Sequence, residues 1–344
     1  MDLTFLLLTL VKIVLICFVF AMIMGALLTW VERKLSAAVH DRVGPNRASI
    51  MGVTAMGLLH PIADMIKAFT KEDFVPAGAN KALFALAPML AMVPPLVVFA
   101  VVPFGPGPNF VIAPLDTGML FILAIGGLGI YGAALGGWAS NNSFALLGSL
   151  RAAAQMISYE VSMGLNLVGI FLIFGTVSLS QIVLGQGELL WGWLPMWGIV
   201  LQPVAFILFL TASMAENKRA PFDLPEGESE ILGYNLEYSS MRFALFFLSE
   251  FVEIVVIAAV AATLFFGGWQ IPWVDPQGTA GGWITAGQVA AFVGKVVFLC
   301  WVQMMIRWTL PRFRYDQVMT LGWKYLLPLS LANIVVTAIV VAML

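Results

Sequence analysis

Long apolar segments alternate with shorter polar ones along most of this 344-residue chain. A helix that crosses the hydrocarbon core of a bilayer needs about 20 apolar residues, because each residue adds about 1.5 Å. Eight segments meet this length, so the pattern predicts an all-α polytopic membrane protein in which residues 1–344 form a single integral domain. The predicted spans are about 5–30, 82–103, 118–139, 156–175, 194–214, 242–266, 287–308 and 324–344.

A ninth stretch, about 50–69, is too polar to span because it contains His60, Pro61, Asp64 and Lys67. Its mixture of apolar and charged residues predicts an amphipathic helix lying at the membrane interface. This stretch falls in the loop 31–81 that follows the first span. Together with the loop 215–241, that loop holds the most informative polar residues, and we expect both loops to be functional.

The basic residues predict the topology of the chain. Lys and Arg gather in the first, third, fifth and seventh loops, where the third contributes Arg151, while the second, fourth and sixth loops contain none. Positive charge marks the cytoplasmic or matrix side of a membrane protein. The odd-numbered loops are therefore predicted to lie on that side, and both termini outside.

Composition narrows the chemistry that the chain can carry. Hydrophobic residues make up 61% and charged residues 10%, whereas soluble domains carry about 25% charged residues. Cys17 and Cys300 both fall in apolar spans, which argues against a disulfide framework, a cysteine-held iron–sulfur cluster and a zinc site. His40 and His60 lie outside the spans, so we expect no haem and no bound metal. Without a basic soluble domain, a nucleic-acid partner is not expected either.

One motif in the third predicted span has two interpretations. Residues 127–132 match the pattern GxGxxG, but a dinucleotide-binding site needs this pattern between a strand and a helix of a soluble unit. Inside a membrane span, small residues instead let two helices approach closely. We therefore interpret Gly132 and Gly136 as a helix-packing face.

The fifth loop has the strongest local concentration of charge. Five carboxylates lie within fifteen residues, at Glu216, Asp223, Glu226, Glu228 and Glu230. Like charges at close range disfavour joint ionisation, so such a cluster is suited to accept and donate protons near neutral pH. The alternative is an acidic loop that is simply exposed to solvent.

Charged residues inside the predicted spans are a second candidate for proton chemistry. They include Glu160, Glu250, Glu253 and Lys295. A charge at the bilayer centre costs at least about 2.5–3.5 kcal/mol, so it is normally paired or in contact with water and marks an ion or proton path. The alternative is a structural ion pair, for example between Lys295 and one of the two neighbouring acids.

The first and seventh loops mix basic residues with acids and aromatic residues. In the first loop, residues 32–34 (ERK) are followed by the turn-forming stretch 42–47 (RVGPNR), and the seventh contains residues 307–317 (RWTLPRFRYDQ). Each of these loops could bind anionic lipid headgroups and anchor the chain, or it could be a docking surface. The residues alone therefore leave two functional classes open, a subunit of an energy-converting redox complex and an independent ion-coupled transporter.

These loops resemble the signature stretches of one family. Residues 32–34, 42–46 and 221–230 (PFDLPEGESE), with 60–64, 157–161 and 312–317, are similar to the H subunit of bacterial proton-pumping NADH–quinone oxidoreductase, respiratory complex I, and to its mitochondrial counterpart, subunit 1. The resemblance covers essentially the whole chain. Related chains occur in membrane-bound hydrogenases, but the complete 221–230 signature favours the quinone enzyme.

The resemblance implies roles for individual residues, position by position. For the quinone chamber it implies Arg33, Arg42, Asp64 and Phe222. For proton coupling it implies Glu160, Glu216, Asp223, Glu226, Glu228, Glu230 and Glu250. We add Glu253 and Lys295 to this group as charged residues inside the predicted spans. For subunit docking or loop support it implies Arg47, Arg219, Arg307, Arg312, Arg314 and Asp316.

The resemblance also implies how the chain works with others. No complete catalytic site or redox cofactor is expected in this chain, and quinone is its substrate. FMN and iron–sulfur clusters are expected on peripheral-arm partner subunits, and small membrane subunits, antiporter-like subunits and lipids as further partners. The expected location is the bacterial inner membrane, with the mitochondrial inner membrane as the alternative.

Overall fold

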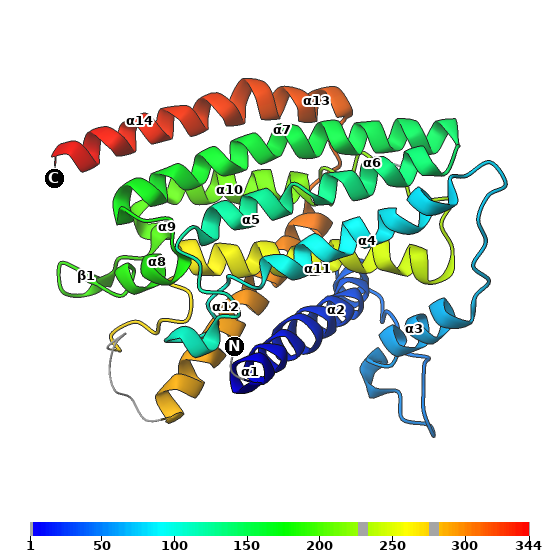
Figure 1. Ribbon diagram of the computed structural model, residues 1–344, viewed down its shortest axis with the longest axis horizontal. Coiled ribbons are helices and arrows are strands. Elements are labelled where there is room, and N and C mark those ends of the chain that lie inside the picture. The colour runs from blue at the N-terminus through cyan, green and yellow to red at the C-terminus, as the bar shows by residue number, and fades with distance from the viewer. Residues whose placement is uncertain (1–2, 226–232, 275–281, 344) are drawn as a thin grey trace.

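The computed structural model describes residues 3–225, 233–274 and 282–343. Within these residues the regular structure is helical apart from one small hairpin of β1 (Leu189–Leu190) and β2 (Leu194–Pro195). Long helices lie side by side in a bundle, and α3 lies apart at one end (Figure 1). The structure confirms the predicted, mostly helical architecture.

The helices follow the apolar segments of the sequence. The long ones are the continuous rod of α1 (Leu3–Ile13), the π-helix η1 (Val14–Met22) and α2 (Ile23–Val39), then α4 (Lys81–Val98), α5 (Gly118–Gly126), α6 (Gly129–Ala139), α7 (Ser143–Phe174), α10 (Pro203–Glu216), α11 (Ser240–Phe265), α12 (Gly282–Thr309) and the rod of α13 (Tyr315–Thr320), η4 (Leu321–Leu326) and α14 (Leu327–Met343). Short elements are η2 (Ala55–Gly57), α3 (His60–Thr70), η3 (Pro108–Phe110), α8 (Leu179–Gly185) and α9 (Gly198–Leu201).

Seven helical segments of the described residues are long and apolar enough to cross a membrane. The remaining predicted span, 194–214, is interrupted at Gln202 between α9 and α10, and α10 alone has 14 residues. Pro203 occupies the first turn of α10, where its missing amide hydrogen is tolerated. Seven of the eight predicted spans thus correspond to helical segments of the described residues that are long and apolar enough to cross a membrane.

Two predicted boundaries near the functional loops were wrong. α7 begins at Ser143 and not at about 156, so Arg151 lies inside a helix and the third loop is short. The first span extends through α2 to Val39, which makes Glu32 and Arg33 helical. In both cases polar residues continue a helix beyond its apolar part, because helical hydrogen bonding does not require apolar side chains.

Three further segments also differ from the prediction. α4 ends at Val98 and not at 103, and the last helical rod begins at Tyr315 and not at 324. The amphipathic helix is confirmed only for α3, which starts at His60. No residue of α3 is buried within this chain, as expected for a helix that lies at an interface.

Helix α11 forms the centre of the bundle and packs against α2, α4 and α12. Every residue from Ile254 to Phe265 is buried. The outer helices instead expose large apolar side chains such as Leu8 and Phe298, which is the pattern expected where lipid is the solvent. Polar residues carried by α11 are therefore held deep inside the molecule.

Glycines bring α6 close to its neighbours. A Cβ atom on Gly132 would lie 2.6 Å from the backbone nitrogen of Ala91 in α4, and one on Gly136 would lie 3.1 Å from the ring of Phe246 in α11. The structure therefore confirms that Gly132 and Gly136 form a helix-packing face.

We predict that Gly132→Ala destabilises the protein by about 1–3 kcal/mol, because the added methyl group must push α4 and α6 apart. Gly129→Ala is the matched control, since a Cβ atom at Gly129 would meet nothing within 4 Å. The control should be neutral or slightly stabilising, because alanine is the better helix former. Thermal unfolding of the two purified variants in detergent measures the difference, and equal melting temperatures would contradict the packing role.

Candidate functional site

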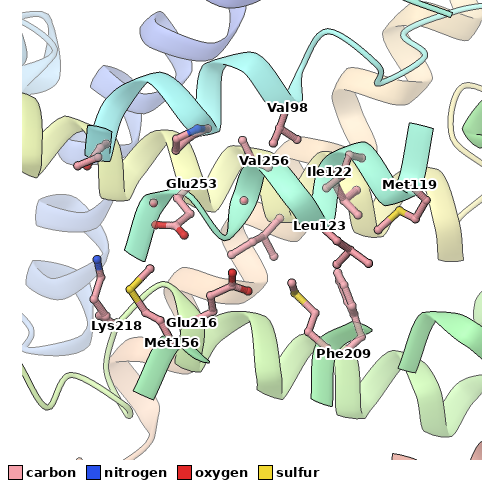
Figure 2. Close-up of a pocket in the computed structure, with 18 residues that line it drawn as sticks. Val98, Met119, Ile122, Leu123, Met156, Phe209, Glu216, Lys218, Glu253 and Val256 are labelled. Carbon is pink, nitrogen blue, oxygen red and sulfur yellow. The ribbon is translucent and has the colours of Figure 1, made fainter. Parts of the chain in front are cut away.

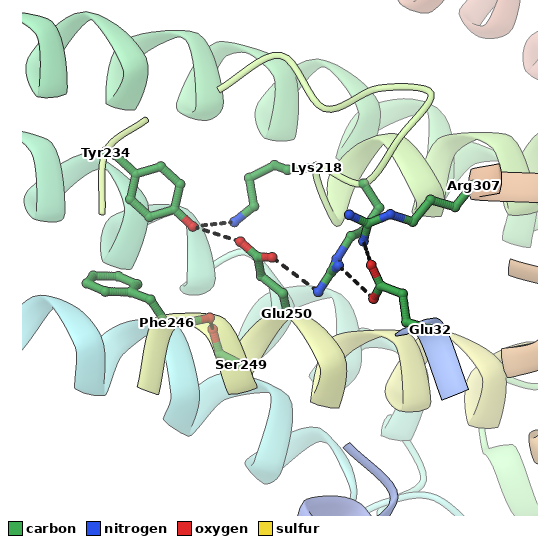
Figure 3. A network of polar contacts seen from close by, with 8 residues as sticks. Glu32, Lys218, Tyr234, Phe246, Ser249, Glu250 and Arg307 are labelled. Carbon is green, nitrogen blue, oxygen red and sulfur yellow. Dashed lines mark hydrogen bonds and ion pairs between the residues drawn. The ribbon is translucent and has the colours of Figure 1, made fainter. Parts of the chain in front are cut away.

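Four charged residues form a buried network at one end of the bundle. Arg219, just after α10, places one guanidinium nitrogen 3.2 Å from the Glu32 carboxylate of α2 and the other 3.3 Å from the Glu250 carboxylate of α11. Arg307 of α12 lies 2.8 Å from the second oxygen of Glu32. The side chains of Arg219, Glu32 and Glu250 are only 8%, 12% and 9% exposed. The network thus joins three helices and the α10–α11 connection (Figure 3).

The network continues from Glu250 toward Lys218. The Tyr234 hydroxyl donates to Glu250 at 3.3 Å, and the Lys218 ammonium donates to the Tyr234 hydroxyl at 3.4 Å (Figure 3). The Arg219 guanidinium also lies over the ring of Phe251, 4.2 Å from its centroid, and such a cation–π contact is favourable when it is desolvated. Opposite charges and aromatic faces therefore surround every buried cation of this network.

A cavity lies beside the network, between α4, α5, α7, α10 and α11. Glu216 of α10, Glu253 of α11 and Lys218 line its polar end, and apolar residues such as Met119 and Phe209 line the other (Figure 2). The cavity volume is about 70 Å³. One water needs roughly 10–15 Å³ of such space and two to four polar partners. The cavity therefore has room for water, and its polar end supplies the hydrogen-bond partners.

Three carboxylates from three helices meet near this cavity. Glu160 of α7 reaches the break between α5 and α6, where a Cβ atom on Gly127 would lie 2.6 Å from its carboxylate oxygen. Both Glu253 and Glu160 are near enough to interact electrostatically with Glu216. Glycine at position 127 leaves the space that Glu160 occupies. The arrangement can bind water and exchange protons among its members.

Asn217 connects the two acids of α11. With its amide nitrogen turned toward α11, Asn217 donates to the Glu253 carboxylate at 3.0 Å and to the Glu250 backbone carbonyl at 3.3 Å. Glu250 therefore belongs to the charged network and Glu253 to the cavity, although the two are three residues apart. Glu253, the less favoured acid in the sequence, is the one that lines the cavity.

The segment between α10 and residue 225 is held in place by contacts with α7, α12 and the seventh loop. Gln155 of α7 donates to the carbonyl oxygens of Ala215 and Phe222, at 2.6 and 2.8 Å. Asp223 pairs with Arg312 at 2.9 Å. Burial raises the pKa of Asp223, and the nearby Arg312 partly offsets that shift.

The Phe222 side chain is only 4% exposed and packs between the rings of Tyr159 and Phe313, with centroid distances of 5.9 and 5.5 Å. In this chain Phe222 therefore belongs to a hydrophobic cluster, and it does not line the cavity that contains Glu216.

The other predicted chamber and docking residues lie at the surface. Arg33 of α2 pairs with Asp64 of α3 at 2.6 Å, and their side chains are 40% and 47% exposed. Arg42 and Arg47 are exposed. Arg314 and Asp316 form an exposed pair with each other. These side chains are accessible to partners, whereas Arg219 and Arg307 support the inside of the chain.

Lys295 lies apart from the acids. Its ammonium donates to the carbonyl oxygens of Phe266, Gly268 and Gln270, at 2.8, 2.9 and 2.6 Å, and lies 4.7 Å from the centroid of the Trp197 ring. The structural alternative considered from the sequence, an ion pair of Lys295 with Glu250 or Glu253, is not the arrangement found here. The turn after α11 leaves carbonyl groups that face the lysine, and these take the place of a carboxylate.

Several residues of the site were missed by the sequence interpretation. Tyr234, Asn217 and Lys218 connect the network to the cavity, and Glu32 had been placed only within a loop motif. The sequence held one indication of their role: Asn217 and Lys218 lie between Glu216 and Arg219, two predicted site residues. Three predicted acids, Glu226, Glu228 and Glu230, lie outside the described residues. Among the described residues, no group of three His, Cys, Asp or Glu side chains is placed to hold a metal ion.

The chain is similar to known proteins over nearly its full length. A family model described as NADH dehydrogenase matches residues 11–338. One H subunit of the NADH-quinone oxidoreductases of Geobacter metallireducens is 48% identical over 337 residues, which cover 95% of this chain and 94% of the relative. An H subunit from Geobacter sulfurreducens is 48% identical, with 95% and 94% covered, and one from Cytophaga hutchinsonii is 42% identical, with 93% of each covered.

We predict that Arg219→Met destabilises the protein by about 3–5 kcal/mol, because it leaves the buried Glu250 without its cation. Thermal unfolding in detergent measures the effect. The double variant Arg219→Met with Glu250→Gln should recover part of the loss, since the uncompensated charge is removed. Arg314→Met is the control, because it breaks an exposed pair, and such pairs contribute little. No recovery in the double variant would contradict the charge argument.

We also predict that Lys295→Met lowers the stability by about 2–3 kcal/mol, because three buried carbonyl groups lose a charged donor. Methionine keeps the length of the side chain, so packing changes little. Lys81→Met, at an exposed lysine, is the matched control and should leave the melting temperature unchanged. If the two variants melt at the same temperature, Lys295 does not hold the α11–α12 turn.

Proposed function

The chain belongs to the NADH dehydrogenase family, and on this basis we propose that it is the membrane subunit of a proton-pumping NADH–quinone oxidoreductase in which quinone reduction is linked to proton movement. Its relatives are named as subunits of that enzyme, so this chain is one part of a larger complex. The seven long apolar helices found among the described residues agree with a place in the membrane.

The finer assignments form part of the same proposal. Counting α9 with α10 as one span gives eight transmembrane helices with both termini outside, in a bacterial inner membrane. Peripheral-arm subunits would carry FMN and the iron–sulfur clusters and supply the electrons. Small membrane subunits and antiporter-like subunits would lie beside this chain in the membrane. This chain would hold no redox cofactor, and quinone would be its substrate.

The observation that carries the proposal is the meeting of Glu160, Glu216 and Glu253 beside a cavity that can hold water. Acids buried in a membrane protein are costly and mark proton paths. In this chain they lie next to a charged network that extends to the loop after α10. A protein with this arrangement can transmit a change of charge at that loop to acids within the membrane.

Quinone would approach from the side of α2 and α3. Arg33 and Asp64 form a half-exposed pair between these helices, and Arg42 is exposed nearby in the chain. Phe222 would act indirectly, by packing the loop 217–225 against α7 and the seventh loop. The acids Glu226, Glu228 and Glu230 would follow directly after that loop.

Reduction of a quinone to a quinol takes up two electrons and two protons, so protons must be drawn from nearby groups. Loss of protons changes the charge around the network of Glu32, Arg219 and Glu250. Lys218 contacts Tyr234 of that network and also lines the cavity with Glu216. Two unit charges about 4 Å apart interact by about 4 kcal/mol at an effective dielectric constant of 20. Through interactions of this kind, a change of charge at Lys218 would alter the protonation of the cavity acids, which would then pass it to partner subunits.

We predict that Glu216→Gln and Glu253→Gln each reduce quinone reduction and proton pumping together by at least tenfold, because each removes a titratable group from the cavity. The assay is NADH-driven quinone reduction and proton uptake in membrane vesicles, with assembly verified by the yield of intact complex. Glu188→Gln is the matched control, at an exposed acid near the β-hairpin, and should retain normal activity.

The result that contradicts the proposal is wild-type reduction and pumping in both cavity variants. If reduction persists while pumping is lost, the cavity acids carry protons but do not govern the chemistry of quinone.

A further inference from the structure

Helix α7 has a second polar face that the carboxylate cavity does not use. Its members are Gln155, Ser158, Tyr159, Ser162 and Asn166. Their three- and four-residue spacings place them on one side of the helix, and all five are buried. This side is packed against α10 and against the rod that contains α14. We call these residues and their partners the polar seam.

The seam is well bonded at the end near the charged network. Tyr159 donates to the carbonyl oxygen of Val318 at 2.7 Å. The indole nitrogen of Trp323 donates to the Ser158 hydroxyl at 3.1 Å. Gln155 donates to the two carbonyl groups of the α10 end described above. Each of these side chains has a partner on another element, and the Gln155 amide oxygen is the one atom among them without a hydrogen-bond partner in the described part of the chain.

The seam is equally well bonded at its other end. Gln202, between α9 and α10, donates to the Thr337 hydroxyl at 2.7 Å and accepts from the Asn333 amide at 2.9 Å. A Cβ atom on Gly169 of α7 would lie 3.2 Å from the Gln202 amide oxygen. Gln202 therefore connects α14 to α7 at this level.

The middle of the seam is different. Ser162 and Asn166 are both 0% exposed. The hydroxyl oxygen of Ser162 and both amide atoms of Asn166 have no hydrogen-bond partner in the described part of the chain. An amide or hydroxyl buried without a partner costs about 1–3 kcal/mol in proteins. Three such atoms lie within about one helical turn. This indicates that a small bound molecule makes the hydrogen bonds that no protein group makes.

A third polar group comes from α14. Helices α7 and α14 run in the same direction side by side (Figure 1), and Trp323 is level with Ser158. Counting seven residues further along each helix, we infer that Ser330 of α14 lies near the turn of α7 that contains Asn166. Ser330 is also 0% exposed, and its hydroxyl donates to the Leu326 carbonyl, which leaves its oxygen able to accept.

We propose that Ser162 and Asn166 hold internal water in the seam between α7, α10 and α14. Internal waters typically make about three hydrogen bonds to buried polar groups that lack other partners. The three side chains are neutral and offer both donors and acceptors, which suits water. A cation would need carboxylates or several carbonyl groups. The water thus completes a row of hydrogen bonds that joins α14 to the rest of the bundle.

The test is a cryo-electron microscopy map of the intact complex at a resolution that shows ordered water. We expect discrete density within hydrogen-bond distance of both the Ser162 hydroxyl and the Asn166 amide. Asn166→Leu should lose that density, because leucine has the same branched shape as asparagine without a polar atom. Direct bonds from both side chains to protein groups, with no density between them, would overturn the proposal, as would density that persists unchanged in Asn166→Leu.

Two more variants keep the test decisive if Asn166→Leu does not assemble. Asn166→Ser replaces the amide by a smaller polar group, a hydroxyl, and frees volume, so at least one additional water density is expected beside it. Ser158→Ala is the control on the same helix face, because Ser158 already bonds to Trp323. It should leave the density at Asn166 in place. If the Asn166→Ser map shows no water, the seam is dry and the proposal fails.

Discussion

Arg219 places one cation between two carboxylates that come from different helices, Glu32 on α2 and Glu250 on α11. None of these charges is stable alone at such burial, because removing an ion from water costs several kcal/mol even after the protein relaxes. The network is therefore kept as a unit, and it determines how the connection after α10 enters the bundle. Asn217 and Lys218 precede Arg219 directly, so their positions at the cavity follow from the same constraint.

Because α11 lies at the centre of the bundle, the charged network is held next to the cavity. Glu250 and Glu253 lie one turn apart on a helix that is covered by its neighbours. One faces the arginine and the other faces the cavity, so a single helix connects the charged network with the acids at the cavity. Glu160 and Glu216 complete the group from α7 and α10. Glu160 enters through a gap left by a small residue, Gly127.

The same helices carry two polar regions of opposite character. The cavity between α7, α10 and α11 contains ionisable groups, and the polar seam between α7, α10 and α14 contains only neutral amide and hydroxyl groups in its centre. α7 separates the two, with Glu160 on one side and Ser162 and Asn166 on the other. Neutral groups are less costly to bury than charges, which allows the seam to hold helices together without attracting ions.

The membrane class, the helical content and seven spans followed from the sequence, because a bilayer demands long apolar segments whatever their neighbours are. The family followed from the loop signatures, and the packing role of Gly132 from its place in a span. Helix ends such as those of α2 and α7 did not follow, since polar residues can continue a helix. The partners of Glu250, Glu253 and Lys295 were decided only by the tertiary structure. Residues far apart in the chain, such as Glu32 and Arg219 or Lys295 and Phe266, meet through packing, and no periodicity along the sequence encodes which charge will face which partner.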